Sequence, residues 1–225
     1  MRESVLLVHG IWMPGAIMSM LRHRLEEHGF AGRLFDYYAV NVDLDDNAER
    51  LARVMAEEAE GRDAVHVVGH SLGGVVALRA HKRHPDAPPG RIVCLGSPLC
   101  GSRAATELAR WRIGQRMLGR TITSGVMVEP ADCWGADVAA RRDVGVIAGN
   151  RPIGLGRVIA AFDEENDGAV AVSETRLPGA EHLVMPVTHT GLVWSREVAD
   201  QVATFLRTGH FAHPAARGRA HRDAV

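Results

Sequence analysis

The stretch from residue 63 to residue 84, DAVHVVGHSLGGVVALRAHKRH, constrains the fold of this chain more than any other part of it. Its first half reads as a short buried strand, and its second half reads as an apolar helix that Pro85 ends. Between the two lies Gly69-His70-Ser71-Leu72-Gly73, the pattern G-x-S-x-G. Glycine lets the strand and the helix approach closely, and such a turn holds its serine in a strained backbone conformation. The stretch therefore predicts a serine hydroxyl that is lifted out of a sheet.

A strand before the pattern and a helix after it are the context in which this motif carries chemistry. On these residues the chain resembles the α/β-hydrolase superfamily, in particular its small bacterial lipases and esterases. The resemblance spans about residues 4–208. It implies an α/β fold with a mostly parallel sheet of about six strands, helices on both faces and a short cap insertion. The alternative is an ordinary glycine-rich strand-to-helix connection, in which case the other parts of a serine hydrolase should be missing.

Apolar runs of strand length alternate with amphipathic helical runs, which favours a parallel sheet covered by helices. Strands are predicted at 4–9, 31–40, 65–68, 92–95, 144–149 and 183–188, and further helices at 15–29, 47–60 and 195–207. Gly29 is expected to end the first helix, Asn47 to cap the second, and Pro186 to mark an edge strand. The length and the 46% hydrophobic content suit one domain over residues 1–208. The basic segment 209–225 is predicted to be a flexible tail.

Residues from about 101 to 143 interrupt the alternation. Hydrolases of this shape carry an insertion over the active site at this point, so the resemblance implies a cap or short lid that lines an acyl pocket. A plain crossover helix with an exposed loop is the other interpretation. Both stay open, because aromatic and methionine side chains suit a core as well as a pocket.

The resemblance assigns a carboxylate and an imidazole to later loops. Asp167, in the string Asp-Gly-Ala-Val after strand 144–149, is the expected acid, and His189 follows the last strand as the expected base. The chain order Ser71, Asp167, His189 is the order of α/β-hydrolases and differs from that of two familiar protease classes.

Neighbouring groups of the same types are weaker candidates. Asp163, Glu164 and Glu165 are expected to be solvated loop charges, and His182 is expected to lie before the last strand, on the wrong side. Ser97 and Ser102 are excluded as nucleophiles, because neither stands in an elbow.

Two backbone amides are expected to form an oxyanion hole, namely the N–H groups of Ile11 and Leu72. Ile11 follows His9-Gly10 after the first strand, where the resembling lipases place one donor, and Leu72 follows the nucleophile. Each such donor is worth roughly 3–4 kcal/mol of transition-state stabilisation. The ring of His9 is expected to brace this loop.

The predicted chemistry is hydrolysis of a carboxylic ester with a hydrophobic acyl group through an acyl-enzyme on Ser71. Apolar residues are expected at the mouth of the site: Trp12, Met13, Leu99, Trp111 and Leu192. An acyl thioesterase using the same triad is the alternative. For that alternative, a carrier's phosphate could be bound by three arginines, Arg103, Arg110 and Arg112. The simpler interpretation is that they form a solvated helix face. A binding module without turnover is the remaining possibility, and an intact triad speaks against it.

Bulk properties exclude several other partners and cofactors. The net charge of −1 and the pI near 6.9 give no attraction to nucleic acid or to an anionic membrane. A secretory signal and an 18-residue apolar run are not recognisable, so a cytoplasmic protein is expected.

Three cysteines, Cys94, Cys100 and Cys133, are too few for a disulfide framework. A pair between the last two stays possible, although buried roles as small apolar residues are preferred. His66 and His70 lie on a strand and in a turn without a metal-binding motif, so neither a metal nor another cofactor is expected.

Overall fold

The computed structural model describes residues 2–109, 119–123, 127, 129–153 and 163–212. They form a sheet of six strands in the order β2-β1-β3-β4-β5-β6, and every neighbouring pair runs parallel. The strands are β1 (Glu3–Val8), β2 (Ala31–Phe35), β3 (Ala64–His70), β4 (Ile92–Leu95), β5 (Val144–Gly149) and β6 (Glu181–Met185). This confirms the predicted α/β class and the parallel sheet.

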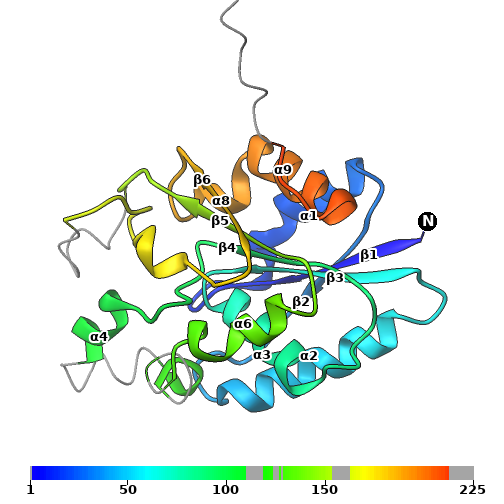
Figure 1. The fold of residues 1–225 in the computed structure, drawn as a ribbon, viewed down its shortest axis with the longest axis horizontal. Coiled ribbons are helices and arrows are strands. Elements are labelled where there is room, and N and C mark those ends of the chain that lie inside the picture. The colour runs from blue at the N-terminus through cyan, green and yellow to red at the C-terminus, as the bar shows by residue number, and fades with distance from the viewer. Residues whose placement is uncertain (1, 110–118, 124–126, 128, 154–162, 213–225) are drawn as a thin grey trace, which may run out of the picture.

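Helices cover both faces of this sheet (Figure 1). One face carries α1 (Ser19–Glu27), α8 (Gly191–Trp194) and α9 (Arg196–Thr208), and the other carries α2 (Leu44–Glu58), α3 (Leu72–Arg83) and α6 (Asp132–Ala139). Alternate side chains of the central strands β1, β3, β4 and β5 divide between two buried clusters, with Leu6 and Val67 on the α3 face and Val5 and Val68 on the α9 face. These four strands are therefore apolar on both sides, whereas the edge strands β2 and β6 are only partly buried.

Several boundaries differ from the predicted ones because side-chain contacts override local patterns. The first predicted helix divides into a 3₁₀ turn, η1 (Gly15–Met18), and α1, while Gly29 follows with φ 89°. The cap of α2 is Asp43, whose Oδ1 accepts from the Asp46 N–H at 3.0 Å. Asn47, the predicted cap, is instead buried inside α2 and donates to Thr121 Oγ1 at 3.0 Å. Ser195 caps α9 by accepting from the Val198 N–H.

The last strand lies at the edge of the sheet, as Pro186 indicated, although it ends before that proline. His182 lies inside β6 rather than before it, and its Nε2 contacts Thr175 Oγ1 at 2.8 Å. The chain stays packed beyond residue 208, because Phe211 is buried with its ring 4.8 Å from that of Phe205.

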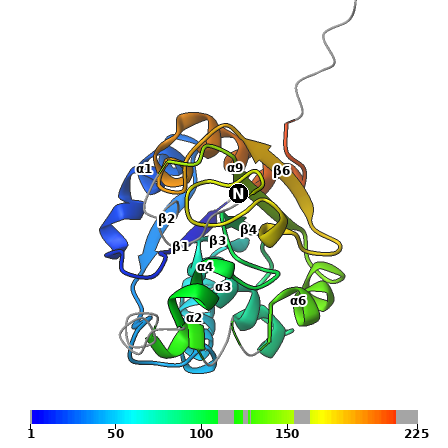
Figure 2. The same ribbon diagram turned by 90° about the vertical axis from the view of Figure 1, so that its left-hand side faces the viewer.

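The described residues of the interrupting segment 101–143 include two helices, α4 (Arg103–Ala109) and α6, which lie at different places. The short helix α4 lies at the end of the molecule toward which the strands point, and Figure 2 turns that end to the viewer. In contrast, α6 packs against α3, and Trp134 is buried in the core. This second part is a crossover helix, whereas the cap role of the remainder stays a prediction.

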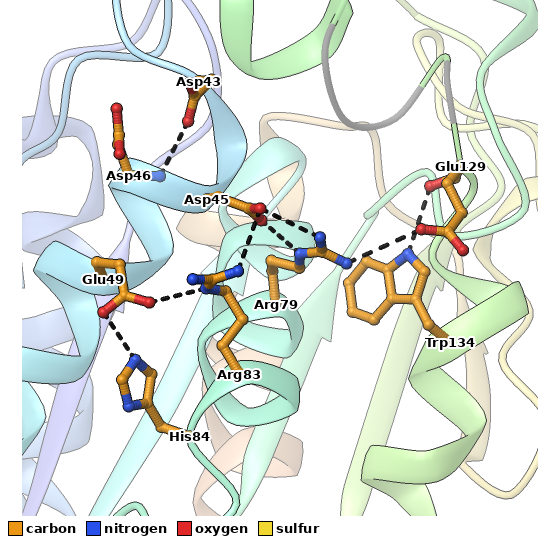
Figure 3. Close-up of polar contacts among 9 residues, drawn as sticks. All are labelled: Asp43, Asp45, Asp46, Glu49, Arg79, Arg83, His84, Glu129 and Trp134. Atoms are coloured by element: carbon orange, nitrogen blue, oxygen red, sulfur yellow. Dashed lines mark hydrogen bonds and ion pairs between the residues drawn. The ribbon is translucent and has the colours of Figure 1, made fainter.

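An exposed network of charges joins α2 to α3 and α6 (Figure 3). We call it the α2–α3 ionic network and define it by Asp45, Glu49, Arg79, Arg83 and His84. Asp45 Oδ1 lies 2.6 Å from Arg79 Nε, and Glu49 Oε1 lies 2.7 Å from Arg83 Nε. The Arg79 guanidinium also lies over the Trp134 ring, 5.2 Å from its centroid. These contacts link the three helices at the surface of that face, above the apolar core that buries them.

The three cysteines are free thiols. Cys94 is buried, as predicted, and burial raises the pKa of its thiol to about 12. Cys100 and Cys133 are exposed, so the predicted burial was wrong for both.

Candidate active site

Ser71 stands at a sharp turn between β3 and α3. Its backbone has φ 53° and ψ −124°, a left-handed conformation that a side chain rarely adopts. Close contacts enforce the turn, because a Cβ at Gly69 would lie 2.4 Å from the backbone of Gly73, and one at Gly73 would lie 2.2 Å from the Val8 carbonyl oxygen. The Ser71 N–H is held by the Leu95 carbonyl at 2.8 Å. Both glycines of the pattern are thus required by contact.

Asp167 lies in a tight turn that its own carboxylate stabilises. Asp167 Oδ1 accepts from the N–H groups of Ala169 at 2.9 Å and Val170 at 2.8 Å. Gly168 adopts φ 98° at this turn, where a side chain would be strained. The carboxylate is 1% exposed, and Oδ2 is left for a partner outside the turn.

That partner is His189, which lies in the loop between β6 and α8. Its Nδ1 lies 2.7 Å from Asp167 Oδ2, and its backbone N–H donates to the Asp167 carbonyl at 2.9 Å. Since a carboxylate only accepts, Nδ1 carries the proton and Nε2 is left with a lone pair. The structure therefore fixes the tautomer that a general base needs.

The elbow and this pair meet at the turns that follow β3 and β4. His70, directly before Ser71, contacts the His189 carbonyl oxygen through Nε2 at 3.0 Å, and the two rings are 4.6 Å apart. A Cβ at Gly96 would lie 2.9 Å from Asp167 Oδ2 and 3.1 Å from His189 Nδ1. Among the described residues, no hydrogen bond is recorded between Ser71 Oγ and His189. Catalytic hydrogen bonds are often long before substrate binds, so this geometry is compatible with a base and nucleophile pair.

The loop after β1 lies against the elbow. A Cβ at Gly10 would lie 3.0 Å from Ser71 Cβ, which places the loop carrying Ile11 beside Ser71. Leu72 is the first residue of α3, so its N–H is one of those that a helix leaves unpaired and that attract negative charge. Trp12 has φ 56°, a second strained position, and this strain shapes the same loop.

His9 holds the base of this loop through both ring nitrogens. Nδ1 lies 2.7 Å from the Gly10 carbonyl oxygen, and Nε2 accepts from the Tyr37 N–H at 3.4 Å. The His9 and Tyr37 rings stack with their centroids 4.6 Å apart. This arrangement agrees with the bracing role that the sequence suggested.

Comparisons with known proteins agree with this geometry. A model of the family described as "Alpha/beta hydrolase family" matches residues 5–221. The chain belongs to that family. An AB hydrolase superfamily protein from Gibberella zeae is 36% identical over 98 residues, which are 40% of this chain and 34% of the relative. The Lipase LipV of Mycobacterium tuberculosis is 34% identical over 87 residues, which are 36% of this chain and 33% of the relative. The matches thus cover about a third of the length of these curated relatives.

Solved structures place the fold among lipases and esterases. The mature lipase BlEst2 of Bacillus licheniformis has a TM-score of 0.72 at 20% identity and covers 93% of both chains. A phospholipase PlaB from Legionella pneumophila has a TM-score of 0.61 at 17% identity, covering 78% of this chain and 44% of that one. At such low identity the likeness shows the fold of this hydrolase and not its substrate.

The residues predicted at the mouth of the site differ widely in exposure. Trp12 is 55% exposed and Met13 is half-buried, whereas Leu99 and Leu192 are completely buried. Substrate could reach the two leucines only after neighbouring side chains move, so their contact with substrate stays a prediction. Trp111 lies outside the described residues.

The three acidic residues that were weaker candidates than Asp167 are exposed. Asp163, Glu164 and Glu165 all face solvent, as solvated loop charges should. Glu164 pairs with Arg103, which also binds Glu174. Arg103 is therefore engaged with carboxylates, while Arg110 and Arg112 lie outside the described residues.

Two buried residues near the site were not recognised in the sequence. Glu174, 6% exposed, accepts from the N–H groups of Ala171 and Arg103 and so ties the Asp167 loop to α4. His70 is fully buried against His189. The sequence signal for Glu174 was weak, because a lone glutamate in a loop is usually solvated. His70 stood inside the motif at a position where the pattern accepts any residue.

The described part of the chain contains neither a cluster of metal-binding side chains nor a helix that could span a membrane. No group of three histidine, cysteine or acidic side chains lies close enough there to hold a metal ion. None of the helices described is sufficiently long and apolar to span a bilayer.

Proposed function

We propose that this α/β hydrolase cleaves carboxylic esters with a hydrophobic acyl group, using Ser71 as nucleophile, His189 as general base and Asp167 as its orienting carboxylate. The observation that carries the proposal is the 2.7 Å contact between Asp167 Oδ2 and His189 Nδ1, beside a serine held at φ 53°. A buried carboxylate fixed by two backbone amides and turned to an imidazole next to a strained serine is the arrangement that activates a hydroxyl.

In the first half of the reaction, Ser71 Oγ attacks the carbonyl carbon of the ester and transfers its proton to His189 Nε2. The carbonyl oxygen becomes an oxyanion, which the N–H groups of Ile11 and Leu72 would stabilise. Asp167 stabilises the imidazolium that forms. The bond to the leaving oxygen then breaks, and His189 gives its proton to the departing alcohol.

In the second half, water attacks the acyl-enzyme. His189 Nε2 takes one proton from the water, the new carbon–oxygen bond forms, and a second oxyanion occupies the same two amides. Collapse of this intermediate breaks the bond to Ser71, and the proton on His189 returns to Ser71 Oγ. The products are a carboxylic acid and an alcohol, and the enzyme is regenerated.

An ester is favoured over a thioester of a phosphorylated carrier. Arg103, one candidate for binding a carrier's phosphate, is already paired with Glu164 and Glu174. The exposed Trp12 next to the predicted oxyanion loop offers an apolar surface for an acyl chain. Proteins named lipase among both the curated relatives and the solved structures point in the same direction.

Covalent labelling tests the proposal directly. A fluorophosphonate should modify the full-length protein on Ser71, and a Ser71→Ala variant should lose labelling and about 10⁵-fold or more of its esterase activity. Ser102→Ala is the matched control, because Ser102 does not stand in an elbow and its Oγ accepts from the Ala105 N–H at 3.1 Å. Labelling that persists in Ser71→Ala would contradict the proposal. A protein that binds ligands without turnover would show neither labelling nor hydrolysis.

Substrate class is separated by parallel assays. p-Nitrophenyl esters of graded chain length and acyl-CoA thioesters are compared by kcat/KM on the same preparation. The proposal expects the highest kcat/KM for an ester with a medium or long acyl chain. Much faster turnover of acyl-CoA than of every ester would instead assign a thioesterase.

A further inference from the structure

His70 is a buried histidine that the catalytic scheme above does not use. It ends β3 directly before the proposed nucleophile, and its side chain has no exposed surface. Burying a polar ring is unfavourable unless it makes hydrogen bonds, so its partners reveal what it contributes.

One ring nitrogen of His70 binds the backbone of the proposed base. Nε2 lies 3.0 Å from the His189 carbonyl oxygen. A carbonyl oxygen only accepts, so Nε2 carries the proton and donates it. The His189 N–H is held on its other side by the Asp167 carbonyl at 2.9 Å. Two hydrogen bonds thus fix the peptide backbone on either side of the His189 side chain.

The other ring nitrogen of His70 faces the oxyanion loop. Nδ1 has no hydrogen-bond partner among the described residues and is buried. It lies 3.3 Å from the place where a Cβ of Gly10 would be. The ring therefore fills the space between the nucleophile turn, the His189 loop and the loop after β1, and the two histidine rings pack at 48° to each other.

We propose that His70 is a positioning residue, whose Nε2–H donates to the His189 carbonyl and so sets the depth and tilt of the His189 ring toward Ser71. This inference rests on the proposed function. The G-x-S-x-G pattern accepts any residue at this position. The assignment therefore depends on the contact between His70 Nε2 and the His189 carbonyl oxygen.

The surroundings also keep His70 neutral, so that it cannot compete for the proton from Ser71. Burial, together with a positive charge on His189, lowers the pKa of His70 to about 3. The other charged or titratable groups that act on it are Asp167, which raises its pKa, and His9, which lowers it. His70 is therefore neutral near neutral pH and does not take the proton that the proposed mechanism assigns to His189.

Two amide substitutions separate the donor from the mere presence of a polar side chain. In His70→Gln the amide nitrogen reaches about as far as Nε2, whereas in His70→Asn it reaches only as far as Nδ1 and points toward Gly10. We expect kcat for ester hydrolysis to stay within about fivefold of wild type in His70→Gln. In His70→Asn we expect it to fall by roughly 100-fold with KM little changed, because misplacement by about 1 Å costs that much.

His81 provides a matched control. It is also a buried histidine, whose Nδ1 is bonded to the Ala77 carbonyl at 2.9 Å and whose Nε2 has no hydrogen-bond partner in the part of the chain that the structure describes. It lies in the last turn of α3, roughly 15 Å along the helix from Ser71. His81→Gln, whose amide nitrogen reaches past the position of Nδ1 and loses the bond to Ala77, should lower thermal stability without lowering kcat, so the pair distinguishes loss of a buried imidazole from loss of positioning.

A spectroscopic measurement reports the position of His189 independently of turnover. The His189 Nδ1–H in its 2.7 Å bond to Asp167 should give a separate downfield proton resonance in wild type and His70→Gln. The same resonance should broaden or disappear in folded His70→Asn.

Equal kcat in folded His70→Asn and His70→Gln, or lower kcat in His70→Gln, overturns the positioning role. If His70→Asn does not fold, a folded His70→Gln with kcat reduced 100-fold overturns it as well, and near wild-type kcat supports it. Failure of wild type to react with fluorophosphonate would instead reject the proposed function, so the two failures are distinguishable.

Discussion

Two contacts of nearly equal length, in two regions of the molecule, have very different surroundings. Asp167 meets His189 over 2.7 Å with side-chain exposures of 1% and 18%, while Asp45 meets Arg79 over 2.6 Å with exposures of 44% and 23%. Each carboxylate has further partners: two backbone amides for Asp167, and a second arginine, Arg83, for Asp45. Distance alone therefore says little about what a contact does.

The difference lies in water and in rigidity. Water screens the α2–α3 ionic network, and its long side chains lose conformational freedom when they pair, so exposed pairs contribute little. The Asp167 carboxylate is dry and fixed by its own turn, and its partner's ring is fixed by the backbone on both sides. The buried contact sets a geometry, whereas the exposed network adds a small increment of stability. The same substitution in each region tests this contrast.

The largest effect is expected for Asp167→Asn. The amide can still accept from Ala169 and Val170, but its NH₂ group would face His189 Nδ1 and favour the other imidazole tautomer. We expect kcat for ester hydrolysis to fall by about 10⁴-fold. Steady-state kinetics together with the melting temperature provide the measurement. A decrease of less than tenfold in a folded variant would show that Asp167 is not the orienting carboxylate.

A second prediction concerns acid. Burial lowers the pKa of His66 and of His81 from 6.5 to about 4 and that of His70 to about 3. Between the unfolded and folded pKa values the unfolded chain binds protons that the native chain does not, so stability falls as pH falls. Each of the three histidines should contribute on the order of 1 kcal/mol per pH unit.

Chemical denaturation between pH 7 and pH 4.5 measures this loss of the free energy of unfolding. In His81→Gln the free energy of unfolding should change with pH less steeply than in wild type, by the contribution of one histidine, on the order of 1 kcal/mol per pH unit. An unchanged slope in that variant would contradict the assignment of a neutral buried imidazole to His81. Pairs on the surface should contribute little to the same curve, which keeps the comparison between the two regions sharp.

The smallest effect is expected in the α2–α3 ionic network. A double-mutant cycle of Asp45→Asn and Arg79→Gln should give a coupling of about 1 kcal/mol or less, decreasing as salt is added. The single change at Arg79 should exceed that at Asp45 because it also removes the contact with the Trp134 ring. Denaturant unfolding at low and high salt measures both. A coupling of several kcal/mol that salt does not alter would show that this network is as rigid as the buried pair.

Local signals in the sequence were sufficient for much of the fold. Alternation of strands and helices predicted the parallel sheet, because each central strand is apolar on both faces and each covering helix on one. The serine pattern predicted its turn, because glycine is needed on both sides of Ser71 by direct contact. Catalytic roles for Ser71, Asp167 and His189 stay proposals, resting on their order in the chain and on the geometry described above.

The predicted helix boundaries and buried faces were wrong where several local signals competed, or where a contact with a distant residue determined the structure. The run Asp43-Leu44-Asp45-Asp46-Asn47 offers more than one good helix cap, and the structure uses Asp43 because Asn47 is engaged by Thr121. Within the predicted helix 15–29, Met18 is buried whereas Met20 is 48% exposed. The 3₁₀ turn before α1 shifts the helical face, and no periodicity predicts such a shift.

The sequence by itself predicted the strands and helices, the elbow at Ser71 and the acidic loop at Asp167, because each is signalled by residues that lie within a few positions of one another. Only the tertiary structure decided that His70 binds the backbone of His189, across 119 positions of the chain, and that Leu99 and Leu192 are buried. Such contacts depend on the register of β3 and on the loops that follow β4 and β6. Backbone conformation is encoded locally, whereas the partners of a buried side chain are chosen only when the sheet is assembled.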